Sequence, residues 1–216
     1  MTTARATIVL KDSPRNITGK INAGLAEILN TLLRRKQGVI IREIRELIPQ
    51  AVLAQPEMQE ITGTATPGSL PAQLGIIAGT GDAAAIAIAN AVAQSIAIDV
   101  SKVTKKNLEG GIKLQFMDAT FTDLLSLPEG YVPLEDGGEL HWLDWLLTRG
   151  YTTIVTGYSY KFAIGGRSGG GFMRQPGSWR VPAQYAGTLE DNFITRALSS
   201  QLLEQRIYQV FKRHLK

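Results

Sequence analysis

Residues 16–49, NITGKINAGLAEILNTLLRRKQGVIIREIRELIP, decide the fold because they carry the longest apolar pattern of the chain. In the first half of this stretch, apolar side chains recur at three- and four-residue spacing: Ile17, Ile21, Leu25, Ile28, Leu32 and Leu33. The pattern resumes after residue 38 with Ile40, Ile41, Ile44, Leu47 and Ile48. Such spacing places the apolar side chains on one face of a helix. We therefore expect a long amphipathic helix that Asn16 or Thr18 caps and that Pro49 ends.

A basic segment, Arg34-Arg35-Lys36-Gln37-Gly38, interrupts this pattern, and we expect a kink or a break there. The three cations have two interpretations. They form a solvated face or the end of a helix, where positive charge complements the helix dipole. Alternatively, Arg34, Arg35 and Lys36 contact DNA or an acidic partner.

The flanks of the helix look irregular. Residues 1–15 are expected to form an N-terminal arm that contains the short apolar run ATIVL. Residues 49–82 contain four prolines and several glycines and threonines, so we expect an extended loop. A long loop inside a compact domain is usually functional or disordered.

The remaining chain alternates between helical and extended patterns. Residues 83–98, AAAIAIANAVAQSIAI, favour an alanine-rich helix that packs closely on the long helix or across a subunit boundary. Strands are expected over IKLQF (residues 112–116) and over residues 152–164, a short helix over residues 139–149, and a final helix that Thr188 or Asp191 caps. We predict a single α+β domain over residues 1–216. Its small, mainly antiparallel sheet packs against the long N-terminal helix, the alanine-rich helix and the C-terminal helix.

Composition excludes several classes of site. The 216 residues include no cysteine and two histidines, so thiolate chemistry and a histidine-based metal centre are not expected. No phosphate-binding GxxxxGK[ST] pattern occurs, and Gly79-Thr80-Gly81-Asp82 is expected to be a turn and cap. We expect no cofactor and no membrane segment, and synthesis in the cytoplasm. The net charge of +4 indicates solubility or, alternatively, a surface near nucleic acid.

The second informative stretch, residues 165–196, begins with five glycines in seven positions. We expect an extended loop over residues 163–188 that orders against a partner. Its Trp179, beside Arg180 and ahead of Pro182, is the residue type that dominates interface energy. The predicted protein-interface residues are Phe172, Met173, Trp179 and Arg180, together with Trp142 and Trp145, for which core packing is the alternative.

One catalytic motif requires consideration. Gly166-Arg167-Ser168-Gly169-Gly170 matches G-x-S-x-G, the nucleophile elbow of α/β-hydrolases, and Asp191 and His214 follow in the correct chain order. The motif requires a helix directly after the serine, whereas glycines and Pro176 follow here. A small serine hydrolase that uses Ser168, Asp191 and His214 therefore stays an alternative function. A second alternative is a basic DNA-binding module that uses Arg34, Arg35, Lys36 and the cations of residues 212–216.

Several short phrases of this chain occur in the same order in a known family. They are GIKLQF, ELHWLDWLL, Tyr158-Ser159-Tyr160, SGGGFM, GSWRVP, AGT and DNFITRAL. In these phrases the chain resembles neck and tail-completion proteins of long-tailed bacteriophages, over roughly residues 16–212 and most strongly over residues 140–198. Relative to the family core, residues 49–82 and 118–138 are additional.

The resemblance implies a structural virion protein and no enzyme. It implies a homo-oligomeric ring, a hexamer or dodecamer, at the head–tail junction, where genomic DNA passes through the lumen without sequence specificity. The implied neighbours are the connector and the tail tube or sheath proteins. The implied location is the virion, and the host cytoplasm during assembly. Tail terminator, connector and head-closure protein stay open as subtypes.

Overall fold

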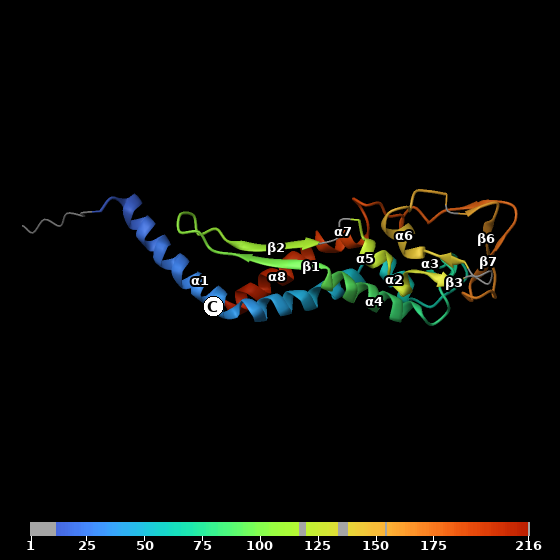
Figure 1. Ribbon diagram of the computed structural model, residues 1–216, viewed down its shortest axis with the longest axis horizontal. Helices are drawn as coiled ribbons and strands as arrows, with labels where there is room; N and C mark the ends of the chain where they lie inside the picture. Colours follow the sequence, from blue (N-terminus) through green and yellow to red (C-terminus); the bar gives the residue numbers. More distant parts are fainter. Residues whose placement is uncertain (1–11, 117–119, 134–137, 154, 216) are drawn as a thin grey trace, which may run out of the picture.

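The computed structural model describes residues 12–116, 120–133, 138–153 and 155–215, so most of the predicted arm lies outside the described residues. The fold is α+β, as predicted. Figure 1 shows an elongated molecule with one long helix, α1 (Pro14–Leu53), as its spine. Short helices and ribbons gather around one end of α1, and the other end projects away from them. We call the gathered elements the body. The rest of α1, with the longest ribbon and the C-terminal helix beside it, is called the arm from here on, and it is distinct from the N-terminal arm predicted for residues 1–15.

The spine helix α1 is continuous over 40 residues, so of the kink or break predicted at residues 34–38 the break is excluded. Figure 1 shows a change of direction along the helix instead. The helix also continues through Pro49, which was predicted to end it. A run of fully buried side chains at four-residue intervals explains why packing outweighs the local cost of proline: Ile40, Ile44, Ile48 and Val52.

The start of α1 also differs from the prediction. The N-cap is Ser13, whose Oγ accepts a hydrogen bond from the backbone N–H of Asn16 at 3.3 Å. Pro14 occupies the first helical turn, where its fixed φ suits a helix and its missing N–H has no cost. The helix therefore begins earlier than Asn16 or Thr18 would allow.

The extended loop predicted for residues 49–82 is mostly helical. It contains the end of α1, then α2 (Pro56–Thr62) and α3 (Leu70–Gln73). Of the four prolines that suggested a loop, Pro56 and Pro71 lie in the first turns of α2 and α3, where proline favours helix initiation. Pro49 lies inside α1, and Pro67 lies in a turn. Met58, Ile61 and Leu70 are buried, so this segment belongs to the core of the body.

The alanine-rich helix α4 (Gly81–Gln94) packs along α1, as predicted. Its buried alanines allow this close approach, and the helix ends at Gln94. The chain then enters β1 (Ile96–Ser101), which the sequence analysis had partly assigned to the helix. The alternation of Ile96, Ile98 and Val100 is a strand pattern, and it sets the conformation here although the preceding alanines favour a helix.

The strands form four separate two-stranded antiparallel ribbons within the described residues. The longest joins β1 to β2 (Gly111–Phe116), with Ile96 opposite Phe116 and Ser101 opposite Gly111. The others pair β3 (Val132–Pro133) with β4 (Glu139–Leu140), β5 (Val155–Thr156) with β8 (Ser178–Trp179), and β6 (Ser159–Phe162) with β7 (Gly171–Arg174). The predicted strand over residues 152–164 is therefore two strands, and β7 and β8 lie inside the loop predicted for residues 163–188.

The remaining helices are short except at the C-terminus. They are α5 (Thr122–Leu125), the 3-10 helix η1 (Pro128–Gly130), α6 (Trp142–Leu147), α7 (Phe193–Leu198) and α8 (Gln201–His214). The predicted final helix is thus α7 followed by α8, because Ser200 caps a new helix with its hydroxyl. Asn192, not Asp191 or Thr188, caps α7 through a capping box with Thr195.

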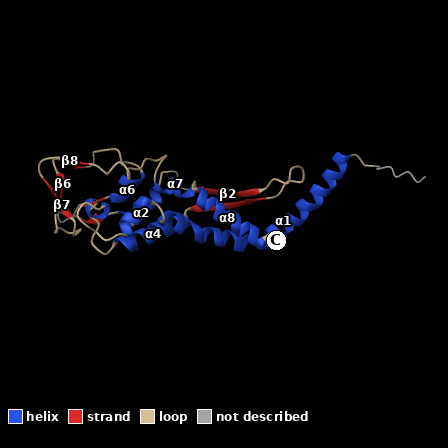
Figure 2. Cartoon of the chain, turned by 180° about the vertical axis from the view of Figure 1, so that it is seen from behind, coloured by secondary structure: helices blue, strands red, loops and turns tan. Residues whose placement is uncertain are grey.

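Two apolar clusters match the body and the arm. The larger lies in the body and includes Trp142, Phe193 and the buried residues of α2 and α4. The smaller lies in the arm between α1, the β1–β2 ribbon and α8, around Leu33, Ile40, Ile44 and Val210. Figure 2 shows the same arrangement from behind, with α8 and the β1–β2 ribbon following the middle of α1.

Candidate interaction surfaces

The three tryptophans proposed for an interface lie in the core, which for Trp142 and Trp145 is the alternative that the sequence left open. Trp142, Trp145 and Trp179 are 1%, 9% and 8% exposed. Trp179 donates a hydrogen bond from Nε1 to Gln73 Oε1 at 3.1 Å. The ring centroids of Trp179 and Trp145 lie 5.7 Å apart in an edge-on arrangement. The β5–β8 pairing turns Trp179 inward, so packing within the chain already uses its apolar surface.

Of the other predicted interface residues, Phe172 and Arg180 are exposed and Met173 is half-buried against the core. Phe172 belongs to a wider exposed apolar set at the end of the body. We call this set the ribbon-end patch: Tyr158, Phe162, Ile164 and Phe172. It covers both faces of the ribbon, because Phe172 pairs with Lys161 and therefore lies on the opposite face from Phe162. Ile164 is 96% exposed, in the connection between β6 and β7.

The glycine-rich segment before β7 serves a tight connection between β6 and β7. Gly166 and Gly169 both have φ of +73°, a conformation that side chains with a Cβ rarely adopt. A Cβ on Gly170 would lie 2.5 Å from the Cβ of Ala72, so this backbone packs directly against α3. These glycines therefore have a role within the chain, whether or not a partner also contacts the segment.

The predicted Ser168–Asp191–His214 constellation is not assembled. Ser168 is 3% exposed and is followed by β7, not by the helix that a nucleophile elbow requires. Asp191 Oδ1 pairs with Arg196 Nη1 at 2.6 Å, and His214 Nε2 lies 2.9 Å from Glu43 Oε1. The end of α8 lies in the arm, whereas β6 and β7 lie at the far end of the body (Figure 1).

The described part of the chain contains no cluster of three or more potential metal ligands. Among its helices, none has the length and apolar character needed to cross a membrane.

The basic residues singled out in the sequence lie along the arm. Arg34, Arg35 and Lys36 are exposed on α1. The cations at the end of α8 lie beside the same helix, because Arg213 Nη1 is 3.0 Å from Glu43 Oε2 and His214 contacts the other oxygen of Glu43. Glu43 follows Lys36 by roughly two helical turns, so both sets belong to one stretch of α1.

The outer part of α1 carries the clearest unpartnered surface. Ile21, Leu25 and Ile28 are 55%, 43% and 60% exposed, and their spacing places them in one line, which we call the outer stripe. The other side of this helix is held by the β1–β2 connection: Asn22 Nδ2 donates to the carbonyl of Lys106, and Asn30 bonds both backbone groups of Val103. The apolar periodicity was recognised in the sequence, but its exposure was not.

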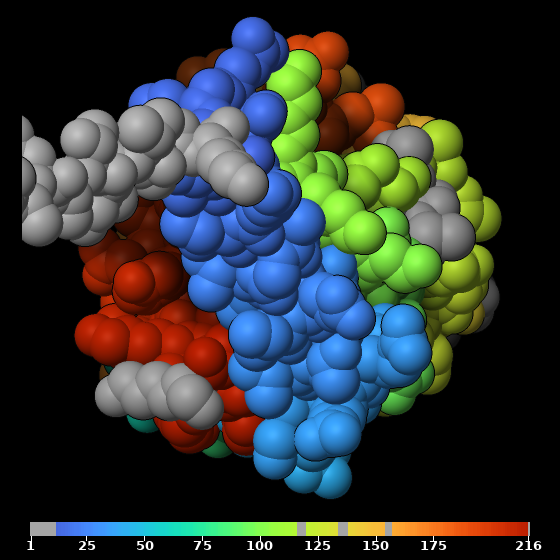
Figure 3. Space-filling model, turned by 90° about the vertical axis from the view of Figure 1, so that its left-hand side faces the viewer, coloured from blue at the N-terminus to red at the C-terminus, as the bar shows by residue number. Residues whose placement is uncertain are grey.

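A groove lies beside the stripe-bearing helix, between the β1–β2 ribbon and α8, and we call it the arm groove. Its volume is about 720 Å³, and its lining is mainly apolar, with Ile112, Leu114, Leu203, Ile207 and Phe211 among its residues. Tyr208, also in the lining, is 62% exposed. Figure 3 looks along the molecule from the projecting end and shows α1 running between α8 and the ribbon. Sequence reasoning missed the groove because it arises from three segments far apart in the chain.

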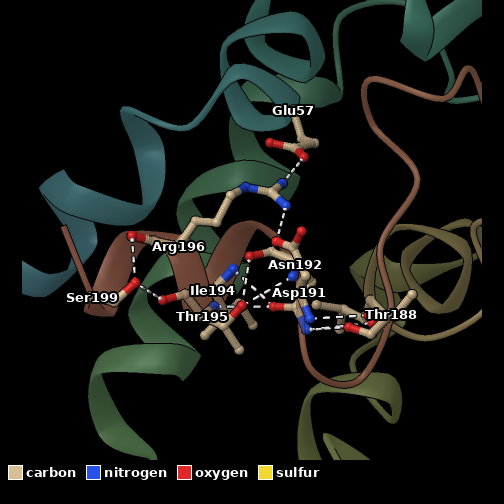
Figure 4. A network of polar contacts seen from close by, with 9 residues as sticks. Glu57, Thr188, Asp191, Asn192, Ile194, Thr195, Arg196 and Ser199 are labelled. Carbon is tan, nitrogen blue, oxygen red and sulfur yellow. Dashed lines mark hydrogen bonds and ion pairs between the residues drawn. The ribbon is translucent and has the colours of Figure 1, made fainter.

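A buried ion pair fixes α7 to α2 in the body (Figure 4). Glu57 is 1% exposed, and its Oε1 pairs with Arg196 Nη2. Burial raises the pKa of the Glu57 carboxyl, although the positive charge of Arg196 opposes this rise. Arg196 also reaches Asp191, next to the Asn192 cap of α7. The arrangement is a brace between two helices, and sequence reasoning did not single out Glu57 or Arg196.

Comparisons of the chain with protein-family models, with curated proteins and with solved structures gave no match.

Proposed function

We propose that this protein is a structural subunit of a tailed bacteriophage that assembles into a homo-oligomeric ring at the head–tail junction. The family resemblance of residues 140–198 suggests this role. The observation that carries it is the outer stripe, a line of large aliphatic side chains exposed on a helix that projects from the body. Contiguous exposed apolar surface in a soluble protein marks an interaction site.

The distribution of exposed apolar surface also suits an assembling subunit. The outer stripe lies in the arm, and the ribbon-end patch lies at the opposite end of the molecule. Two separate surfaces on one chain allow two different contacts, one within a ring and one to a neighbouring protein. The stripe then serves contacts between subunits, and the ribbon-end patch with Arg180 serves a neighbouring connector or tail protein.

The exposed cations supply a surface of the ring that can contact DNA. Arg34, Arg35 and Lys36 lie on the same stretch of α1 as the basic end of α8. In our proposal Arg34, Lys36 and the end of α8 face the lumen, whereas Arg35 lies beside the outer stripe. Contacts between such cations and phosphates are independent of sequence, which suits DNA in transit.

Electron microscopy and sedimentation of the purified protein test this function, together with antibody labelling of phage particles. We expect rings in solution or label at the head–tail junction. A protein that stays monomeric at every concentration and is missing from particles would contradict the proposal. Arg34→Gln/Lys36→Gln chains should form the same rings and bind DNA with a weaker salt dependence.

A further inference from the structure

We propose that the outer stripe of one copy docks into the arm groove of the next copy. This inference rests on the proposed function, because it names the contact that would join subunits of the ring. The partner is therefore a second copy of this chain, and the two surfaces that meet are different.

The stripe has the form of a helix that fills a groove. Ile21, Leu25 and Ile28 follow the i, i+4, i+7 spacing by which an amphipathic helix inserts anchors into an apolar groove. Seven residues of helix extend over about 10 Å. The six-residue strands that border the groove extend over about 20 Å, so the groove is long enough for the whole stripe.

The same molecule cannot supply both surfaces. Asn22 and Asn30 hold the other side of the outer helix against the β1–β2 connection, at the end of the molecule's own groove. This attachment turns the stripe away from the ribbon, because Ile28 and Asn30 lie about 200° apart around the helix. The groove and the stripe of one chain cannot contact each other. Both bury their apolar surface when the stripe enters the groove of a neighbour.

Charge supports the same pairing. Among the described residues that line the arm groove, Glu204 is the charged one. Arg35 and Glu27 border the stripe, in a shallow hollow that they share with Ile28 and Leu32. The two side chains lie about 12 Å apart along the helix, so charge favours the docking register in which the Arg35 end of the stripe meets Glu204.

Cysteine cross-linking tests the contact directly, because the natural chain contains no cysteine. Two chains are prepared separately, one with Ile28→Cys and one with Tyr208→Cys, and are then mixed and oxidised at high protein concentration. We expect a disulfide-linked dimer in the mixture and far less in either chain alone. Self-linking of the Ile28→Cys chain would indicate helix-to-helix pairing and overturn the proposal, as would the lack of any cross-link.

A second pair of variants measures the strength of the contact. Ile28→Asp places a carboxylate in the stripe and should weaken self-association by at least about tenfold, or about 1.4 kcal/mol. Asn16→Asp adds the same group about 120° around the same helix and should leave association unchanged. Both positions are exposed, so thermal unfolding should confirm that both variants fold.

The outcomes separate this contact from the proposed function. Rings that form equally well with Ile28→Asp would overturn the stripe-to-groove contact and leave the ring function in place. A natural chain that neither associates nor joins particles would overturn both.

Discussion

The two halves of α1 carry the same apolar periodicity and have opposite environments. In the inner half, Ile40, Ile44 and Ile48 are fully buried between the ribbon, α8 and the body. In the outer half, Ile21 and Ile28 are more than half exposed. Periodicity therefore shows that a helix has an apolar face, and does not show whether that face is covered by the same chain.

The exposure of the outer half determines when its apolar side chains can contribute free energy, during folding or during association. Complete burial of a large aliphatic side chain stabilises by roughly 1.5–3 kcal/mol. The inner half obtains this stabilisation during folding, and the outer half can obtain it during association. On this view the outer stripe contributes little to the stability of the monomer and much to the stability of an assembly.

The largest expected difference between the halves is the effect of truncating an isoleucine. Ile44→Ala should lower the free energy of unfolding by about 2–5 kcal/mol, because it leaves a cavity between α1, the ribbon and α8. Ile28→Ala removes exposed surface and should change it by less than about 0.5 kcal/mol. Denaturant unfolding of the monomer measures both, and equal losses would show that the monomer itself covers the outer stripe.

The next largest effect concerns the ion pair between Glu57 and Arg196 in the body, against which the inner half of α1 packs. Arg196→Met should cost about 3 kcal/mol, near the lower end of the roughly 3–5 kcal/mol for breaking a buried pair, because Arg196 itself is 37% exposed. Arg149→Met is the matched control, since Arg149 pairs with Asp144 at the surface and is 69% exposed. Chemical denaturation should show little change for the control. A neutral Arg196→Met would mean that α7 does not depend on the brace.

The pH dependence of stability isolates Glu57 within this brace. Its pKa is raised above the ordinary 4.5, so the folded state holds the proton more tightly than the unfolded chain. Its contribution to stability is therefore complete below that pH and declines as the pH rises through the folded-state pKa. Thermal unfolding across pH should show that Glu57→Gln removes this decline. Parallel curves for the natural and substituted proteins would count against burial of a titrating carboxyl.

Much of the fold was predictable from local patterns. The spacing of Ile17 to Ile48 gave the spine helix, and the alanines of α4 gave its packing partner. The errors have two causes: tertiary packing overrode a local signal at some positions, and a local signal for a helix start was misread at others. Prolines at residues 49, 56 and 71 suggested a loop, yet one lies inside α1 and two lie in first turns of helices.

The candidate surfaces were less predictable than the fold. Trp179 has the composition of an interface anchor, but its exposure depends on the β5–β8 pairing, which no local pattern reveals. The arm groove combines side chains from the β1–β2 ribbon with side chains from α8, about a hundred residues later in the chain. The outer stripe was visible as a pattern, but its exposure among the described residues depends on the whole fold.

The smallest expected effect also compares the halves of α1 most directly. Gly24 and Gly38 both lie in exposed turns of the helix, and a Cβ at either position would meet no neighbour within 4 Å. Gly38→Ala should stabilise the folded protein by roughly 0.5–1 kcal/mol, because alanine loses less backbone freedom in a helix. Gly24→Ala should raise the helicity of the outer half and leave the midpoint of global unfolding unchanged, provided that this half opens separately from the body. Circular dichroism and calorimetry distinguish the two results, and an equal rise in the midpoint for both variants would mean that the halves unfold as one unit.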